Sequence, residues 1–213
     1  MTNTTATVSF NTLVELKGVQ TGEIFVSEKN SIHNQNMARI LARALANEPH
    51  SNIMNVALGN GGTYVDSAGI LRYNTTNTTG TAATLYNETY DEYVDGSVVN
   101  GNSVTSAATG GTDVTSFATV SMILTADEPS GQWNTDALGN GTNTNPQNPL
   151  DVASYQFLFD ELGCRTKNPL FISSTLTPSE PEWLLLTHIV FNPIAKSANR
   201  ELQLTYTITI SVS

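Results

Sequence analysis

The sequence contains little cysteine, little positive charge and no long apolar run. Its single cysteine, Cys164, excludes an internal disulfide framework. No apolar run approaches the ~20 residues that a membrane-spanning helix requires. The first ten residues, MTNTTATVSF, have neither a basic region nor an apolar core, so we expect no secretory signal there. These absences argue against a disulfide-stapled secreted domain and against a transmembrane helix.

Positive charge is scarce and also unevenly placed. Lys and Arg number 9 against 19 Asp and Glu, which gives a formal net charge of −10. No Lys or Arg occurs between Arg72 and Arg165, whereas acidic residues are frequent in that stretch. Such a surface repels nucleic-acid phosphates and anionic lipid headgroups. We therefore expect no nucleic-acid partner and no membrane partner.

The chain is rich in neutral polar residues and in residues that favour strands. Thr occupies 30 positions and Asn 22, while 39% of the residues are hydrophobic and 13% charged. Intrinsic disorder requires low hydrophobicity with high charge, so this composition excludes it. Helical bundles need more Ala, Leu, Glu, Lys and Arg than most of this chain supplies. We interpret residues 1–213 as a single β-rich domain.

Alternating or continuous apolar segments predict several strands. The segments are 7–16, 22–27, 52–58, 115–125, 152–159, 184–191 and 202–212. In the last segment every second residue from Leu202 to Val212 is apolar, which is typical of a half-buried strand. Long Thr-, Asn- and Gly-rich loops are expected at about 74–84, 96–113 and 131–149. The pattern predicts a mainly β fold, an antiparallel β-sandwich or jelly-roll-like domain.

One helix is expected, at about residues 34–47. Its apolar stripe has the spacing of an amphipathic helix and consists of Met37, Ile40, Leu41, Ala44 and Leu45. Ser31 or Asn34 can cap the start of the helix, and Pro49 stops it. We expect the helix to pack across a sheet or at its edge.

The segment 59–62, Gly-Asn-Gly-Gly, follows a predicted buried strand. Its glycines allow positive φ and a tight turn. A phosphate-binding loop would require a helix directly afterwards, and residues 63–70 show no helical stripe. We therefore interpret the segment as a turn.

No arrangement of residues predicts catalysis. His33 and His50 lie on either side of the helix, too far apart to share a metal ion by local spacing, and His188 lies in an apolar run that fits a core histidine. Asp160 and Glu161 are neighbours in a predicted strand, so we expect them on opposite faces and not on one substrate. We expect no enzymatic activity, no cofactor and no metal site.

Charged residues offer candidate contacts between subunits. Asp91, Glu92 and Asp95 could collect a hard cation such as calcium, but the spacing of a helix-loop-helix calcium site is missing and a solvated strand edge is the alternative. The helix carries two arginines one turn apart, and two cations lie near the C-terminal end. The six residues that we expect to make contacts, within a subunit or between neighbours, are Arg39, Arg43, Asp91, Glu92, Lys196 and Arg200.

Three segments resemble structural proteins of tailed bacteriophages. NMARILARALANEPHSNIMNVALGNGGT, at 36–63, is similar to the helix, strand and glycine turn near the start of tail-collar and tail-fibre proteins. LYNETYDEYVDG, at 85–96, is similar to the L-x-N-E-x-Y stretch that follows in those proteins. FDELGCRT together with LLTHIVFNPIAKSANRELQLTYTITI resembles the closing strands of phage virion proteins of this length. The resemblance covers about half of the chain.

The resemblance implies a non-enzymatic component of a tailed-phage virion, made and assembled in the cytoplasm of the host bacterium. A tail, collar, neck or baseplate-associated adaptor subunit is expected, which associates with itself as a symmetric homo-oligomer and with other virion proteins. A capsid decoration protein is the first alternative. A second alternative, from the residues themselves, is a carbohydrate-binding host-attachment module that uses Trp133, Tyr64, Tyr90 and Tyr93. A third is a glycan-cleaving enzyme with acids from the 88–95 cluster.

Overall fold

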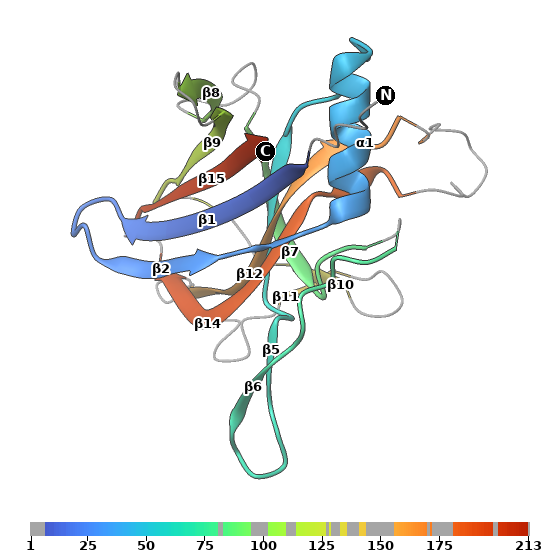
Figure 1. The fold of residues 1–213 in the computed structure, drawn as a ribbon. Coiled ribbons are helices and arrows are strands. Elements are labelled where there is room, and N and C mark those ends of the chain that lie inside the picture. Colours follow the sequence, from blue (N-terminus) through green and yellow to red (C-terminus); the bar gives the residue numbers. More distant parts are fainter. Residues whose placement is uncertain are drawn as a thin grey trace, which may run out of the picture.

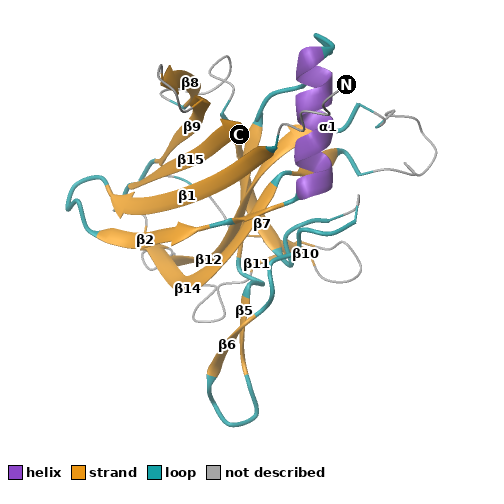
Figure 2. Cartoon of the chain, viewed as in Figure 1, coloured by secondary structure: helices purple, strands orange, loops and turns teal. Residues whose placement is uncertain are grey.

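The computed structural model describes residues 7–80, 83–94, 102–109, 114–126, 128, 133–135, 141–143, 156–169, 171, 181–197 and 200–212. In these residues two antiparallel sheets pack against each other and a single helix lies at one end of the pair (Figures 1 and 2). The predicted mainly β, sandwich-like fold with one helix is confirmed.

The first sheet has the strand order β2-β1-β15-β9-β8. Its strands are β1 (Val8–Gly18), β2 (Ile24–Lys29), β8 (Ser103–Thr109), β9 (Val114–Leu124) and β15 (Leu202–Val212). β15 lies in the middle because it pairs over its whole length with β1 on one side and with β9 on the other. Its alternation places Leu204 and Tyr206 in the core, whereas Thr205 and Thr207 face outward.

The second sheet has the order β3-β14-β12-β4-β7, with one further short strand, β13, beside β12. Its strands are β3 (Ser31–Ile32), β4 (Asn55–Gly59), β7 (Glu88–Tyr93), β12 (Gln156–Lys167), β13 (Trp183–Leu185) and β14 (Thr187–Ser197). All five residues of β4 are buried because both faces of this strand are covered. The sandwich core covers one face, and a small cluster of Ala57, Ala83, Leu85 and Leu185 covers the other.

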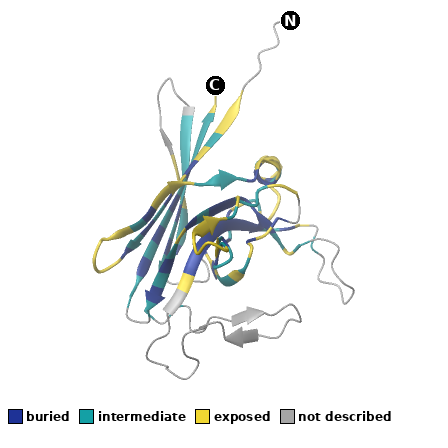
Figure 3. Cartoon of the chain, turned by 90° about the horizontal axis from the view of Figure 1, so that it is seen from below, coloured by how far each residue is buried: buried dark blue, intermediate teal, exposed yellow. Residues whose placement is uncertain are grey.

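The core lies between the inner faces of the two sheets, where Figure 3 shows the buried residues. Phe159, Phe191 and Tyr206 are its largest fully buried aromatic side chains. Cys164 is also fully buried, and burial raises the pKa of its thiol to about 12. Cys164 is therefore a structural thiol in β12 rather than a reactive one.

The helix, α1 (Asn34–Leu45), begins where the sequence predicts but ends two residues earlier. Neither predicted cap is correct. Ser31 belongs to β3, Asn34 is already helical, and the ring Nδ1 of His33 accepts the Asn36 N–H at 3.2 Å instead. The predicted apolar stripe is buried only in its first half: Met37 and Ile40 are buried, whereas Leu45 is 89% exposed.

Two of the three predicted loops contain strands. β8 lies within 96–113, and a small hairpin of β10 (Trp133–Thr135) and β11 (Gly141–Asn143) lies within 131–149. Within 74–84, the described residues form neither helix nor strand. A further hairpin, β5 (Thr63–Val65) and β6 (Leu71–Tyr73), projects away from the sandwich (Figure 1). No helix in the described part of the chain has the length and hydropathy needed to span a membrane.

Candidate functional site

Several exposed large side chains gather on the β5–β6 hairpin, residues 63–73, which we call the arm. Five of its large side chains are at least one third exposed, namely Tyr64 (52%), Val65 (66%), Ile70 (49%), Leu71 (37%) and Tyr73 (51%). Apolar side chains scattered singly over a surface are ordinary, but here five lie on one projecting hairpin. The arm is therefore the first candidate for a contact surface.

The turn at the tip of the arm is held by Asp66. Its carboxylate accepts the N–H groups of Ala68 and Ile70 at 2.9 and 3.0 Å, and Arg72 Nε donates to it at 2.8 Å. The bond from Ile70, followed by that from Arg72, lowers the pKa of Asp66. The tip is thus ordered without a partner and carries a neutralised ion pair.

The root of the arm is tied to a buried carboxylate in β12. Asp160 is 2% exposed, and it accepts the N–H of Gly62 at 2.8 Å and that of Thr63 at 2.9 Å, together with the Thr63 hydroxyl. Burial raises the pKa of Asp160 despite these bonds. On the other side of the root, Asn74 N–H donates to Gly62 O and its side chain donates to Gly61 O.

The neighbouring carboxylate, Glu161, fixes two adjoining loops. It is fully buried and accepts the N–H groups of Gly61, Tyr86 and Asn87 at 3.1, 2.9 and 2.8 Å. Burial alone would raise the pKa of Glu161, but the bond from His188 and these N–H groups outweigh it and lower the pKa.

His188 completes the cluster as a core histidine, which agrees with the sequence interpretation. Its Nδ1 accepts the Asn77 N–H at 2.7 Å, so the ring proton lies on Nε2, which faces Glu161 Oε2 at 3.0 Å. The cluster of Asp160, Glu161 and His188, which we call the buried polar cluster, therefore anchors the arm root and both adjoining loops.

The expectation that Asp160 and Glu161 lie on opposite faces is wrong. The register of β12 against β14 shifts between Phe159 and Glu161. Three residues of β14, 191–193, face the single residue Asp160 there. The alternation of β12 breaks at the same point, because Phe159 and Leu162 both lie in the sandwich core, which leaves Asp160 and Glu161 on the other side. Both carboxylates consequently reach consecutive residues of the same loop, Gly61 and Gly62, and hold its backbone.

The glycines of this loop serve a different purpose from the one predicted. Positive φ among the described glycines occurs at Gly22, Gly69 and Gly80, not in the segment 59–62. A Cβ atom on Gly59 would lie 2.4 Å from Asn87 O, and one on Gly62 would lie 2.7 Å from Asp160 O. The loop needs glycine because neighbouring backbone passes too close for a side chain.

A second polar cluster lies around Arg165, which is 6% exposed. Its guanidinium donates to Asn55 Oδ1 at 2.8 Å, to Glu88 at 2.6 Å and to Asp91 at 3.0 Å. The ring of Trp183 lies 5.1 Å from the guanidinium carbon. Burial raises the pKa of Glu88, although the charge of Arg165 opposes the shift.

The two predicted acidic contact residues face opposite ways. Asp91 binds Arg165 and is half-exposed, whereas Glu92 is 6% exposed. Asn102 donates to Glu92 at 2.7 Å and the Tyr90 hydroxyl donates to it at 3.2 Å. Burial, followed by the charge of Glu128, raises the pKa of Glu92. Asp95, the third acid of the proposed cation site, lies outside the described residues.

Of the two helix arginines, Arg39 is half-buried, while Arg43 is 8% exposed and held within the chain. Arg43 Nε lies 3.3 Å from Glu48, and its other nitrogens donate to the carbonyls of Pro49 and Lys167. The helix therefore does not present Arg43 freely to a neighbour.

The two C-terminal cations also make contacts within the chain. Lys196 lies in β14, is fully buried, and donates to Ala126 O at 3.4 Å. Arg200 donates to Ala195 O at 3.1 Å and covers the Phe25 ring at 5.1 Å. Contacts of the six residues between subunits stay a prediction.

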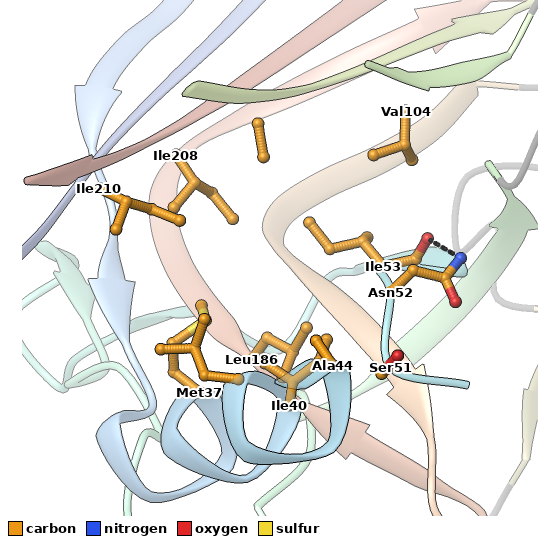
Figure 4. A pocket seen from close by; sticks show the side chains of 12 residues that line it. Met37, Ile40, Ala44, Ser51, Asn52, Ile53, Val104, Leu186, Ile208 and Ile210 are labelled. Atoms are coloured by element: carbon orange, nitrogen blue, oxygen red, sulfur yellow. Dashed lines mark hydrogen bonds between the residues drawn. The ribbon is translucent and has the colours of Figure 1, made fainter. Parts of the chain in front are cut away.

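An apolar pocket of about 200 Å³ lies between α1 and the first sheet. Met37 and Ile40 of the helix face Ile208 and Ile210 of β15 across it, and Val104 of β8 closes one side (Figure 4). None of the lining residues is charged. Among the described residues, no group of three or more His, Cys, Asp or Glu side chains is placed to hold a metal ion.

Sequence reasoning missed the arm, Arg165 and Trp183. The available signal for the arm was two short β-type runs, Thr-Tyr-Val and Leu-Arg-Tyr, around a turn-forming Asp-Ser-Ala-Gly. Arg165 could have been singled out as the first cation after a long cation-free, acidic stretch.

Comparison of the chain with models of protein families, with curated proteins and with solved structures finds no match.

Proposed function

We propose that this chain is a non-enzymatic structural subunit that associates with itself and with a larger assembly. The observation that carries the proposal is the arm, which holds five exposed apolar side chains away from the sandwich on a rigid root. Exposed apolar surface of this kind is stabilised when a partner covers it. In an assembly, a neighbouring subunit can be that partner.

The positions of the carboxylate, histidine and cysteine side chains also support a non-enzymatic subunit. Glu161, His188 and Asp160 are buried, and their described bonds join loops to a strand. Cys164 is buried, and its raised pKa keeps it a thiol. In this proposal these residues stabilise the scaffold that positions the arm.

The assembly that we propose is the virion of a tailed phage, because three segments resemble proteins of such particles. The subunit then belongs to the tail, collar, neck or baseplate, where it associates with copies of itself and with other virion proteins after synthesis in the host cytoplasm. Decoration of the capsid is the alternative position. Copy number per particle separates the two, because decoration proteins cover the whole capsid whereas collar and baseplate subunits form single rings.

The test combines mass in solution with detection on particles. Sedimentation velocity over a range of protein concentrations is expected to give a discrete oligomer, and antibody labelling of intact virions is expected to locate the protein. A protein that stays monomeric and is missing from particles would contradict the proposal.

Glycan binding for host attachment is a second candidate, favoured by the cluster around Arg165. Tyr93 packs edge-on against Trp183 at 5.7 Å, and the carboxylates of Glu88 and Asp91 are partly exposed beside them. Aromatic faces beside hydrogen-bond acceptors suit a sugar. Tyr64 lies on the arm and Tyr90 is bonded to Glu92, while the side chain of Trp133 lies outside the described residues.

The glycan candidate is tested on an array of bacterial surface glycans. Wild-type protein is expected to bind a subset of glycans, and Trp183→Ala to lose that binding while Tyr64→Ala keeps it. No binding by wild type would remove this candidate.

A further inference from the structure

We propose that the tip of the arm docks in the apolar pocket beneath α1 of a second copy of the chain. This inference rests on the proposed self-association and names the two surfaces that carry it. The contact is head-to-tail: each copy offers an arm to one neighbour and a pocket to another.

The pocket has the size and chemistry to receive one or two aliphatic side chains. An apolar cavity of about 150 Å³ stays dry and binds a molecule as large as benzene, and this pocket holds about 200 Å³. Two residues of the apolar stripe of α1 are exposed beside it, Ala44, which lines the pocket at its rim, and the adjacent Leu45. An incoming apolar segment would therefore be in contact with the rim as well as the interior.

The arm presents exposed apolar side chains on an ordered turn, as a ligand of this pocket would. Val65 and Ile70 flank the turn and are 66% and 49% exposed. Three N–H bonds around Asp66, two to its carboxylate and one to its carbonyl, keep the turn in one conformation before binding. An ordered segment loses less conformational entropy on docking than a flexible one does.

Charge favours the same pairing of surfaces. The chain carries a net charge of −10, so two copies repel each other over most approaches. Within the arm, Asp66 and Arg72 cancel, and the lining of the pocket carries no charge. The arm and the pocket are thus two neutral surfaces through which copies of an acidic chain can meet with little repulsion.

The fold prevents the arm from reaching its own pocket. The arm projects from the end of the molecule away from α1 (Figure 1), and the buried polar cluster holds its root in place. Docking must therefore take place between copies. A head-to-tail contact of this kind closes into a ring when the rotation between copies fits, and otherwise extends as a filament.

The test uses complementary variants. Ile70→Glu alters the arm and Ala44→Glu alters the rim of the pocket, and both sites are exposed, so neither change disturbs the core. Leu13→Glu is the matched control, because Leu13 is 47% exposed on β1 and gains the same charge. Urea unfolding of each variant verifies that the fold is retained.

Sedimentation velocity is expected to show oligomers for wild type and Leu13→Glu. Ile70→Glu and Ala44→Glu should each be monomeric, with the dissociation constant raised by about 30-fold or more, as for an interface hot spot. An equal mixture of the two variants should form 1:1 dimers, because one intact arm then meets one intact pocket. A second readout is Ile70→Cys mixed with Ala44→Cys, which should form a disulfide between chains, since the native Cys164 is buried.

Different failures have different meanings. If wild type associates but both arm and pocket variants behave like Leu13→Glu, or the mixture forms no dimer, the docking proposal is wrong and self-association stands. If wild type is monomeric throughout, docking and self-association are both wrong, and labelling of intact virions decides whether the chain belongs to a larger assembly. Native mass spectrometry of wild type gives one more check. If it detects a copurified fatty acid or other apolar ligand, and association with a second copy does not displace that ligand, the docking proposal is also wrong.

Discussion

Asp160 and Glu161 place two carboxylates where the interior of a protein disfavours charge. Burying an ionised carboxylate costs several kcal/mol unless hydrogen bonds replace the lost water. Here the donors include the backbone N–H groups of Gly62, Thr63 and Asn87. The carboxylates satisfy these buried N–H groups, and in return the N–H groups stabilise the charge.

Asp160→Asn is expected to lower the free energy of unfolding by about 1–3 kcal/mol, the cost of an unsatisfied buried donor. The amide has one acceptor oxygen, so its NH₂ group would face an N–H of Gly62 or Thr63. Urea denaturation measures the change. Glu28→Gln, at an exposed position, is the control and should lie within ~0.5 kcal/mol of wild type. Equal effects of the two variants would contradict the anchoring role of Asp160.

Glu92 should make stability depend on pH in the sense opposite to acid denaturation. Its pKa in the folded protein is raised above the ordinary 4.5, first by burial and then by the charge of Glu128. The folded state therefore binds this proton more tightly than the unfolded state does. The contribution of Glu92 to stability is complete below pH 4.5 and is lost as the pH rises through the folded pKa.

Glu92→Gln removes that loss, because Gln can still accept from Asn102 and donate to the Tyr90 oxygen. We expect the variant to be more stable than wild type at pH 7, with a difference that shrinks toward pH 4.5. Thermal or urea unfolding at several pH values measures this. Glu161 has the opposite sign, since its lowered pKa adds stability above 4.5 that is lost in acid. A difference between Glu92→Gln and wild type that is independent of pH would refute the assignment.

Helices and strands with a long apolar periodicity could be predicted from the sequence. Short or polar strands, which form because of the strands that they pair with, could not. Alternation over eleven residues predicted β15 to the residue, and the apolar stripe predicted the start of α1. β8 has the composition Ser-Val-Thr-Ser-Ala-Ala-Thr, which is indistinguishable from the polar loops around it. The strands of the arm have three residues each, too few to show alternation.

The anchoring of the arm could not be predicted for a related reason. It depends on the irregular pairing of β12 with β14 between Phe159 and Glu161, and this irregularity exists only in the register of the two strands. The period-2 alternation of a single strand places neighbouring residues on opposite faces, and it therefore predicts opposite faces for Asp160 and Glu161. Likewise, the crowding at Gly62 comes from Asp160, 98 residues away in the sequence.

Gly62→Ala tests the close approach at the arm root. The added Cβ would lie 2.7 Å from Asp160 O and 2.9 Å from Val190 Cγ1, so backbone must shift and we expect a loss of about 2–3 kcal/mol. Gly69→Ala at the arm tip meets no atom within 4 Å, and its φ of 78° predicts a loss of only about 1 kcal/mol. Urea denaturation compares the two. A larger loss for Gly69→Ala than for Gly62→Ala would show that backbone conformation, not crowding, dominates.

For the molecule as a whole, negative charge opposes self-association. The chain has 9 cations, and several of them make contacts within the chain, among them Arg43, Arg165 and Lys196. Copies that meet through apolar surfaces must therefore overcome repulsion between acidic bodies. Dissolved salt screens that repulsion over distances longer than the Debye length.

Added salt is consequently expected to strengthen the association. Between ~0.01 M and ~0.15 M NaCl the Debye length falls from about 30 to about 8 Å, so the dissociation constant of the oligomer should decrease. Sedimentation velocity in a salt series measures it. Association that weakens with salt would instead indicate ion pairs between subunits, and would return attention to Arg39 and Arg200 as contact residues.

The pairing of β1 with β15 also sets the order in which the protein can fold. Val8 faces Val212 and Gly18 faces Leu202, so contacts in the first sheet span up to about 200 residues of chain. A ribosome releases β1 and β9 before β15, and until β15 emerges β1 and β9 have no strand between them. Such non-local pairing forms slowly. Until β15 is available, the nascent chain exposes the apolar faces of β1 and β9, which are prone to aggregation or non-native contacts.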